Sequence, residues 1–175
     1  MRRALIPAIA LVALAAGPAS AQTPEPTPPC PTSEQFTTLG LTGMQESFAP
    51  EPVPSVGTDI INDEVTPMPY HEESVTRFRY RVDVSGSTAK PFAKTANVTL
   101  TLSWDNDSDF DVYVYDKDDA AIGESVSFNP LDGSGETIGL VGVAHCTDIR
   151  IDVVNYLGLP DSALVLDAKL TNLKP

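Results

Sequence analysis

The richest concentration of metal-binding side chains in this sequence is a short acidic segment near its middle. Carboxylates recur at every second position, at Asp105, Asp107, Asp109 and Asp111. Several carboxylate oxygens close together are the ligands that a hard cation such as Ca²⁺ prefers. The segment is not an EF-hand loop, because its sixth and twelfth positions are Phe110 and Asp116 rather than Gly and Glu. Two interpretations remain open: a calcium site, or a solvated turn in an acidic protein.

Tyrosines that follow this segment form the second candidate site. Residues 110–116 alternate apolar and polar side chains, as a β-strand does, so Tyr113 and Tyr115 point away from the core. Exposed aromatic side chains on a flat sheet are suited to binding a polypeptide or a glycan. Tyr156, in a later strand, can join them. The alternative is that these rings pack across strands or are covered by the N-terminal segment.

Catalytic arrangements are not evident in the sequence. The two histidines, His71 and His145, lie outside any H-E-x-x-H zinc pattern, and no G-x-S-x-G nucleophile motif occurs. Cys146 follows His145, but in an exported chain this thiol is expected to be oxidised rather than nucleophilic. We therefore expect no enzymatic activity and no required cofactor, with a hydrolase as a remote alternative.

The sequence contains two cysteines, Cys30 and Cys146. In an exported protein such a pair predicts one disulfide. The bond would join positions 116 residues apart (146 − 30) and would fasten the N-terminal segment to the rest of the fold.

Export itself is predicted by residues 1–21. Met1-Arg2-Arg3 is a positively charged start, residues 4–16 are almost wholly apolar, and Ala19-Ser20-Ala21 fits a cleavage site before Gln22. Cleavage leaves 9 basic and 24 acidic residues, a net charge of −15 (9 − 24). Such a surface disfavours nucleic acid and anionic lipid as partners. We expect a protein in the extracellular space or the cell envelope, with no membrane insertion after cleavage.

Alternation of apolar and polar residues dominates the chain beyond residue 73 and predicts about seven to eight strands. The expected fold is an all-β, antiparallel β-sandwich, jelly-roll-like, over residues 58–175. Residues 22–57 are expected to form an extended, Pro-rich segment, within which residues 33–48 could be a strand or a short helix. The apolar positions of the strands predict a core that includes Leu100, Leu102, Trp104, Val112, Val114, Ile151 and Leu166.

The order of these strands resembles the bacterial pre-peptidase C-terminal domain, a β-sandwich similar to the collagen-binding domains of collagenases. The resemblance covers roughly residues 58–170 and is carried by ESVTRFRYRVDV (73–84), NVTLTLSW (97–104), DFDVYVYD (109–116), TDIRIDVVNY (147–156) and SALVLDAKL (162–170). It implies that calcium, where bound, also uses acidic residues before the first strand, here Glu72 and Glu73. The sequence departs from the family at residues 143–146, VAHC, where a Gly-Thr-Tyr type of entry is usual. No peptidase domain accompanies the module, so a role as a protease appendage does not transfer directly.

These observations favour a secreted, non-catalytic binding or accessory module that contacts a polypeptide or glycan through a sheet face. The net negative charge favours a neutral or basic partner. The alternative is a structural or Ca²⁺-stabilised envelope or extracellular protein without a small ligand.

Overall fold

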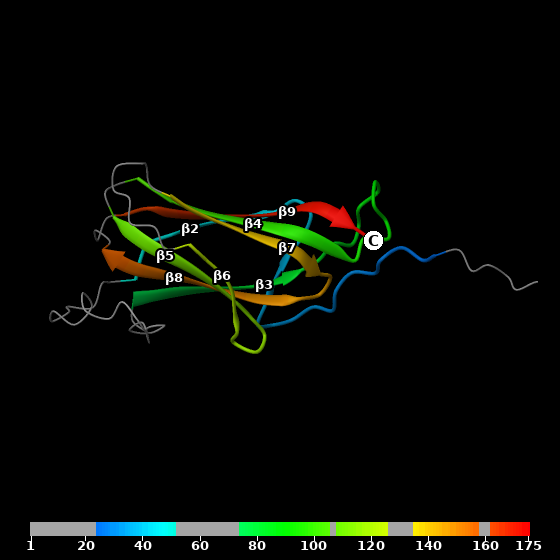
Figure 1. Ribbon diagram of the computed structural model, residues 1–175, viewed down its shortest axis with the longest axis horizontal. Helices are drawn as coiled ribbons and strands as arrows, with labels where there is room; N and C mark the ends of the chain where they lie inside the picture. The colour runs from blue at the N-terminus through cyan, green and yellow to red at the C-terminus, as the bar shows by residue number, and fades with distance from the viewer. Residues whose placement is uncertain (1–23, 52–73, 106–107, 126–134, 158–161) are drawn as a thin grey trace, which may run out of the picture.

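The computed structural model describes residues 24–51, 74–105, 108–125, 135–157 and 162–175, apart from the side chains of residues 156 and 157. Strands account for most of these residues (Figure 1). Their bounds are β1 Thr37–Leu39, β2 Met44–Phe48, β3 Val75–Val82, β4 Thr95–Trp104, β5 Asp109–Asp116, β6 Ala121–Ser125, β7 Gly135–Ala144, β8 Asp148–Leu157 and β9 Leu164–Lys174. The predicted signal peptide lies outside the described residues.

The strands form two sheets that face each other, which confirms the predicted all-β sandwich. Sheet A has the order β1-β3-β8-β5-β6, and sheet B has the order β2-β9-β4-β7. All pairings are antiparallel except that of β1 with β3, which is parallel. The long strands of the two sheets run side by side along the length of the molecule (Figure 1).

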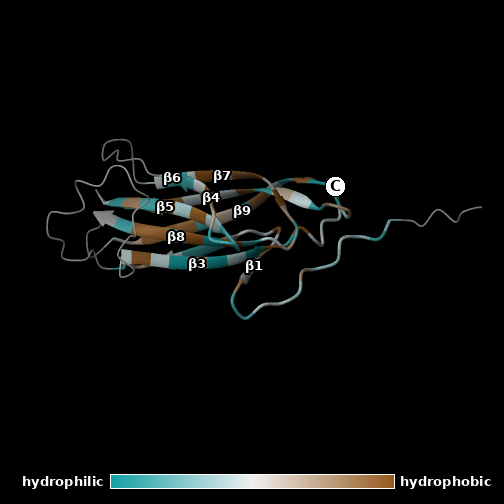
Figure 2. Cartoon of the chain, turned by 60° about the horizontal axis from the view of Figure 1, so that its bottom comes forward, coloured by the Kyte–Doolittle hydropathy of each residue, from teal (hydrophilic) through white to brown (hydrophobic). Residues whose placement is uncertain are grey.

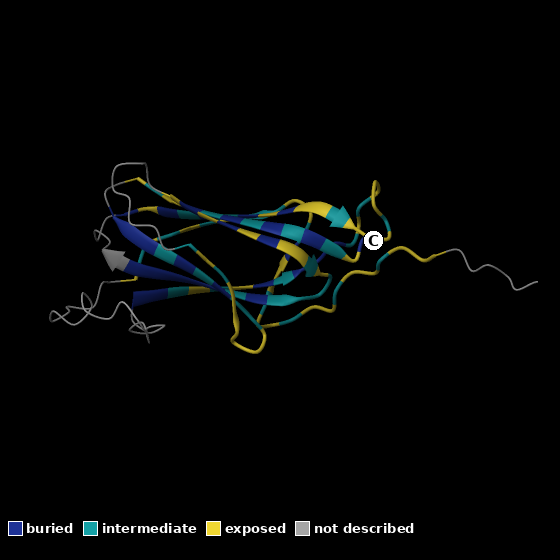
Figure 3. Ribbon diagram, in the orientation of Figure 1, coloured by how far each residue is buried: buried dark blue, intermediate teal, exposed yellow. Residues whose placement is uncertain are grey.

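Alternating hydropathy explains why each sheet has one buried face. Along β3, β5 and β8, hydrophobic and hydrophilic residues follow one another (Figure 2). In β5, Phe110, Val112 and Val114 are buried, whereas Tyr113 and Tyr115, which alternate with them, are only half-buried. In β4 the buried residues are Ala96, Val98, Leu100 and Leu102. The apolar sides of both sheets therefore meet in one core (Figure 3).

The predicted core is confirmed at six positions and wrong at one. Leu100, Leu102, Val112, Val114, Ile151 and Leu166 are each at most 2 % exposed. Trp104 is only half-buried, although its ring lies 5.2 Å from that of Phe110, centroid to centroid. Trp104 is the last residue of β4.

Residues 33–48, for which the sequence allowed either a strand or a short helix, contain two strands, one in each sheet. β1 pairs with the end of β3, and β2 pairs with β9 along its whole length. The turn between them contains Gly43, whose φ of +71° is unfavourable for other residues. A Cβ at Gly43 would also lie 2.7 Å from the Ala168 carbonyl oxygen. Glycine thus allows the chain to cross from one sheet to the other.

Candidate binding surface

The outer face of sheet A places the two predicted tyrosines beside basic side chains of neighbouring strands. Strand register aligns Arg79 of β3 with Arg150 of β8, and Arg150 with Tyr115 of β5. A second row crosses the sheet at the next outward-facing position of each strand. It runs through β3, β8, β5 and β6 and consists of Arg77, Asp152, Tyr113 and Glu124. We call these two rows, from Arg77 and Arg79 to Tyr113 and Tyr115, the Arg–Tyr face.

Tyr115 is held by a neighbouring cation. The guanidinium carbon of Arg150 lies 4.2 Å from the centre of the Tyr115 ring, a cation–π contact. Arg150 also donates to Asp152 (3.0 Å) and forms an ion pair with Asp119. Burial, followed by the nearby Asp152 carboxylate, raises the pKa of Tyr115, so its hydroxyl stays protonated and able to donate. The Tyr115 side chain is therefore fixed in place rather than free on the surface.

Tyr113 is connected to the acidic segment. Its hydroxyl donates to Asp111 at 3.3 Å. Burial, and then the charges of Asp109, Glu136 and Glu124, raise the pKa of Asp111 to about 7. Burial also raises the pKa of Asp109, with a further contribution from Glu136. Asp111 therefore holds a proton far more readily than an ordinary aspartate, and the pKa of Asp109 is shifted in the same direction.

The arginines that the structure describes lie on the outer side of sheet A. Four occur beyond Arg3, namely Arg77, Arg79, Arg81 and Arg150, and strand alternation and register place all of them there. Arg81 donates two hydrogen bonds to the Asp148 carboxylate, at 2.6 and 2.8 Å. The Nε of Arg77 lies 3.5 Å from a carboxylate oxygen of Asp152. Arg79 is exposed and forms no ion pair with the described part of the chain. The face therefore carries both signs of charge: Arg77, Arg81 and Arg150 each lie beside a carboxylate, and Arg79 is exposed.

The outer face of sheet B has a different composition. On β4 it presents Thr99 and Thr101, which are aligned with Lys169 and Asp167 of β9. On β7 the aligned residues are Gly139 and Thr137. Neither aromatic rings nor arginines contribute to these rows, so the two faces of the sandwich differ in the chemistry they offer a partner.

The structure describes only some of the residues that were predicted to bind calcium. Asp105 is exposed and accepts from the Ala163 N–H (3.4 Å), whereas Asp109 is 7 % exposed. Among the described residues, Asp105, Asp109 and Asp111 do not form a group of ligand atoms that could hold a metal ion. Asp107, Glu72 and Glu73 lie outside the described residues, as does the side chain of Tyr156. Glu136, which the sequence did not suggest as a ligand, is 3 % exposed and accepts a hydrogen bond from the Ser125 hydroxyl.

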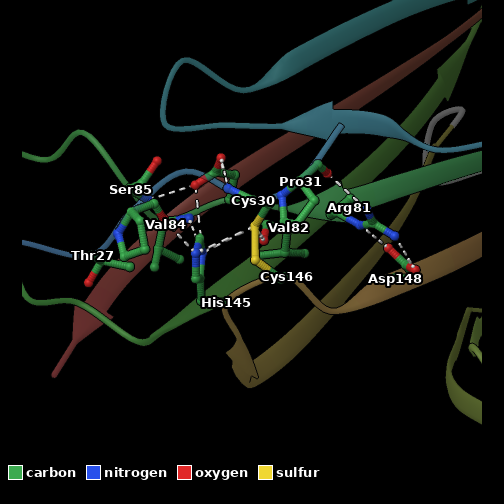
Figure 4. The surroundings of a disulfide bond; sticks show 12 residues. Thr27, Cys30, Pro31, Arg81, Val82, Val84, Ser85, His145, Cys146 and Asp148 are labelled. Carbon is green, nitrogen blue, oxygen red and sulfur yellow. Dashed lines mark hydrogen bonds and ion pairs between the residues drawn. A yellow bond between two sulfur atoms is a disulfide. The ribbon is translucent and has the colours of Figure 1, made fainter. Parts of the chain in front are cut away.

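The predicted disulfide is present between Cys30 and Cys146, with Cα atoms 5.4 Å apart (Figure 4). It attaches the Pro-rich segment to the turn between β7 and β8. Further contacts continue the attachment, because the Cys30 N–H donates to Asp83 and Arg81 donates to the Pro31 carbonyl. The prediction that this bond fastens the N-terminal segment to the sandwich is confirmed.

His145 packs against the same disulfide and forms the one cluster of three metal-type ligands among the described residues, with Cys30 and Cys146. Its Nδ1 lies 3.4 Å from the Cys30 Sγ and accepts from the Val84 N–H (Figure 4). Its Nε2 donates to the Pro28 carbonyl. Because the two sulfurs are bonded to each other, they supply no thiolate for a metal. The arrangement is therefore part of the attachment of the N-terminal segment.

Sequence reasoning identified the tyrosines but not their basic neighbours. The alternation of Arg77, Arg79 and Arg81 was visible along β3. Their proximity to Tyr113 and Tyr115 depends on β8 lying between β3 and β5, which no local pattern reveals. An excess of arginine in one strand of an acidic chain was the available signal.

No protein-family model matches the chain, and no curated protein matches it. Within the described residues, no helix combines the length and apolar character needed to cross a membrane.

Proposed function

We propose that the chain is a secreted, non-catalytic binding module that contacts an extracellular glycan or polypeptide through the Arg–Tyr face. The observation that carries this proposal is the placement of Tyr113 and Tyr115 on the outer side of sheet A, beside arginines from two neighbouring strands. Aromatic and arginine side chains dominate the energetics of binding surfaces. The resemblance to pre-peptidase C-terminal domains, which are similar to collagen-binding modules, supports the same proposal.

The proposal includes export. The N-terminal signal features and the disulfide support a destination outside the cytoplasm, since disulfides persist in oxidising compartments. N-terminal sequencing of the protein after expression in its secreted form tests this, and we expect the mature chain to begin at Gln22.

A double substitution, Tyr113→Ala with Tyr115→Ala, tests the surface. The probes are denatured collagen, casein, an uncharged β-glucan and polygalacturonate, each immobilised and presented with purified mature protein. We expect retention on at least one probe and a clear loss of retention in the double variant. Thr99→Ala with Thr101→Ala is the matched control, because it alters two half-buried outer positions on sheet B. Circular dichroism verifies folding of both variants, and equal retention of the tyrosine variant and wild type would contradict the proposal.

A second candidate function is a structural protein stabilised by Ca²⁺. The specific observation is the burial of Asp109 and Glu136 close to Asp111, which places several carboxylates in a poorly solvated region. A bound divalent cation would offset their repulsion.

A further inference from the structure

We propose that part of the β3 edge binds an extended strand of another protein, in which acidic residues alternate with apolar ones. The site is the edge of Val75–Arg79, which we call the β3 gap. The partner would pair with the backbone at the side of sheet A, whereas a ligand of the Arg–Tyr face would lie on its flat outer side. The inference is therefore independent of the proposed function.

The β3 gap exists because β1 is much shorter than β3. Among the described residues, β1 pairs only with residues 80–82, and Val75–Arg79 have no partner strand on that side. Figure 2 shows β3 at the margin of the molecule, with β1 beside its end. On its other side β3 pairs with β8 throughout the gap, so these five residues already form a regular strand of roughly 17 Å.

The chain that precedes β1 contacts β3 beyond the gap rather than in it. The ring of Phe36, just before β1, lies 5.7 Å from the guanidinium carbon of Arg81. The Pro31 carbonyl accepts a hydrogen bond from the same arginine. The side chains of Arg77 and Arg79, within the gap, are exposed. These contacts place the described N-terminal segment at Arg81 and leave the two gap arginines accessible.

Hydrogen bonds at the end of β3 show which backbone groups face the gap. The Val82 N–H donates to the Thr147 carbonyl (2.9 Å), and the Val82 carbonyl accepts from the Cys146 N–H (2.8 Å), so Val82 faces β8. The next residue, Asp83, donates instead to the Leu39 carbonyl on the β1 side (2.9 Å). Successive residues of a strand direct their backbone groups to opposite sides. Odd-numbered residues of β3 therefore face the side of β1.

Within the gap these odd-numbered residues are Val75, Arg77 and Arg79. Their N–H and C=O groups point to the side on which the described structure has no further strand. A row of such groups on a regular strand is a template for another chain, because each group can complete a hydrogen-bonding ladder. The β3 gap thus offers an added strand three residues of backbone pairing.

Side chains of the gap specify the chemistry of the partner. Arg77 and Arg79 project to the outer side, whereas the half-buried Phe78 projects inward, with its ring centre 4.9 Å from that of Phe48. An added strand places its own residues on the same two sides, and opposite charges on paired strands stabilise a sheet. Because Arg77 already lies beside Asp152, the exposed Arg79 is the main partner for a carboxylate. An apolar residue next to it would cover Phe78.

A second copy of this chain is disfavoured as the occupant. Antiparallel pairing of two β3 gaps over all five residues places Arg77 opposite the Arg77 of the other copy. Like charges opposite each other on neighbouring strands destabilise a sheet. Two chains that each carry a net charge of −13 also repel each other. The charges therefore favour a strand from a different protein.

Calorimetry of the mature protein with synthetic peptides tests the proposal. The probe is a seven-residue peptide that alternates glutamate and valine, and a peptide with lysine in place of glutamate is its charge control. Two further peptides carry N-methyl groups on either the glutamate or the valine nitrogens. We expect the glutamate peptide to bind and the lysine peptide to bind far more weakly. One of the two methylated peptides should lose binding, because only alternate N–H groups of an added strand face β3.

Arg79→Pro and Arg79→Ala form a matched pair of variants. Both remove the arginine side chain, but only proline also removes the N–H that faces the gap. Proline is tolerated there because this N–H takes no part in the ladder with β8. We expect Arg79→Pro to bind the glutamate peptide at least about tenfold more weakly than Arg79→Ala, as for a lost hydrogen bond. Circular dichroism verifies that both variants fold.

Hydrogen exchange locates the bound strand without any substitution. In the free protein we expect the Arg77 and Arg79 amides to exchange rapidly and the Phe78 amide, which faces β8, to exchange slowly. The glutamate peptide should slow the two arginine amides. Protection of both arginine amides in the free protein would show that the gap is already filled, and it would overturn the proposal.

The remaining outcomes are also distinct. Equal binding of the two Arg79 variants, equal binding of the lysine peptide, or no effect of either methylation overturns the proposal, as does failure to bind at millimolar peptide. If Arg79→Pro does not fold, the methylated peptides and the exchange measurement decide. The Tyr113→Ala, Tyr115→Ala variant should bind the peptide as wild type does, so failure here leaves the proposed function of the Arg–Tyr face to its own test.

Discussion

Asp111 combines burial with acidic neighbours, and these raise its pKa from an ordinary value of 3.8 to about 7. The folded protein therefore retains a proton that the unfolded chain releases, and stability should be greater near about pH 5 than near about pH 8. Replacing Asp111 with Asn removes the charge but keeps an acceptor for Tyr113. We expect this variant to melt at a higher temperature than wild type near pH 8, and the gain to shrink near pH 5.

Thermal unfolding across this pH range measures the effect. Asp118→Asn is the control, because Asp118 is exposed and pairs only with Lys117 next to it among the described side chains. A pH profile of the Asp111 variant that parallels wild type would show that Asp111 does not titrate in this window.

Trp104, the only tryptophan, packs edge-on against Phe110 at the end of β4. Truncating a fully buried aromatic side chain costs about 3–5 kcal/mol, so Trp104→Ala should cost no more than about 3 kcal/mol. Trp104→Phe should cost less, since it keeps the ring contact. Denaturant unfolding measures both, and acrylamide quenching should show partial access to Trp104. Complete protection from quenching would contradict its half-buried position.

At the scale of elements, the Pro-rich segment is joined to the sandwich by one covalent bond and several hydrogen bonds. The disulfide closes a loop with a separation of 116 residues. Such a bond contributes typically 2–5 kcal/mol, mainly by restricting the unfolded chain. We expect the Cys30→Ser, Cys146→Ser double variant to lose stability within this range in denaturant unfolding.

A hydrogen-bond variant separates the covalent contribution from the local contacts. Thr27 donates to the Ala93 carbonyl at 2.7 Å, and Thr27→Val should cost only about 1 kcal/mol. The unfolded, non-reduced wild-type protein should contain no titratable thiols. Two thiols per chain, or a double serine variant as stable as wild type, would contradict the structural role of the bond.

At the scale of the whole molecule, an excess of acidic residues makes the effect of cations on folding a direct test of the calcium proposal. A ligand at 100 times its dissociation constant adds about 2.7 kcal/mol to stability. If calcium binds near Asp109 and Asp111, millimolar Ca²⁺ should raise the melting temperature above that in chelator at matched ionic strength. Asp111→Asn should reduce this gain. An unchanged melting temperature would contradict the calcium proposal.

Strand content, core and disulfide were accessible from the sequence, because each depends on local or compositional rules. Alternation within β5 requires Phe110, Val112 and Val114 to share a side, whatever strand lies beside them. The pairing of Cys30 with Cys146 followed from their number and the export signal. Trp104 was misjudged because alternation gives the side of a strand but not the distance to the edge of the core.

The tertiary structure alone decided which side chains meet on the sheet faces. Arg79, Tyr115 and Arg150 come from three strands, with 36 positions (115 − 79) and 35 positions (150 − 115) between neighbours along the chain. Their alignment depends on strand order and register, which arise from packing both sheets into one core rather than from any local preference. The parallel pairing of β1 with β3 and the passage of residues 37–48 between sheets have the same origin. The tyrosines were therefore predictable as outward-facing residues, whereas the arginines and aspartates that lie beside them could be placed only from the folded structure.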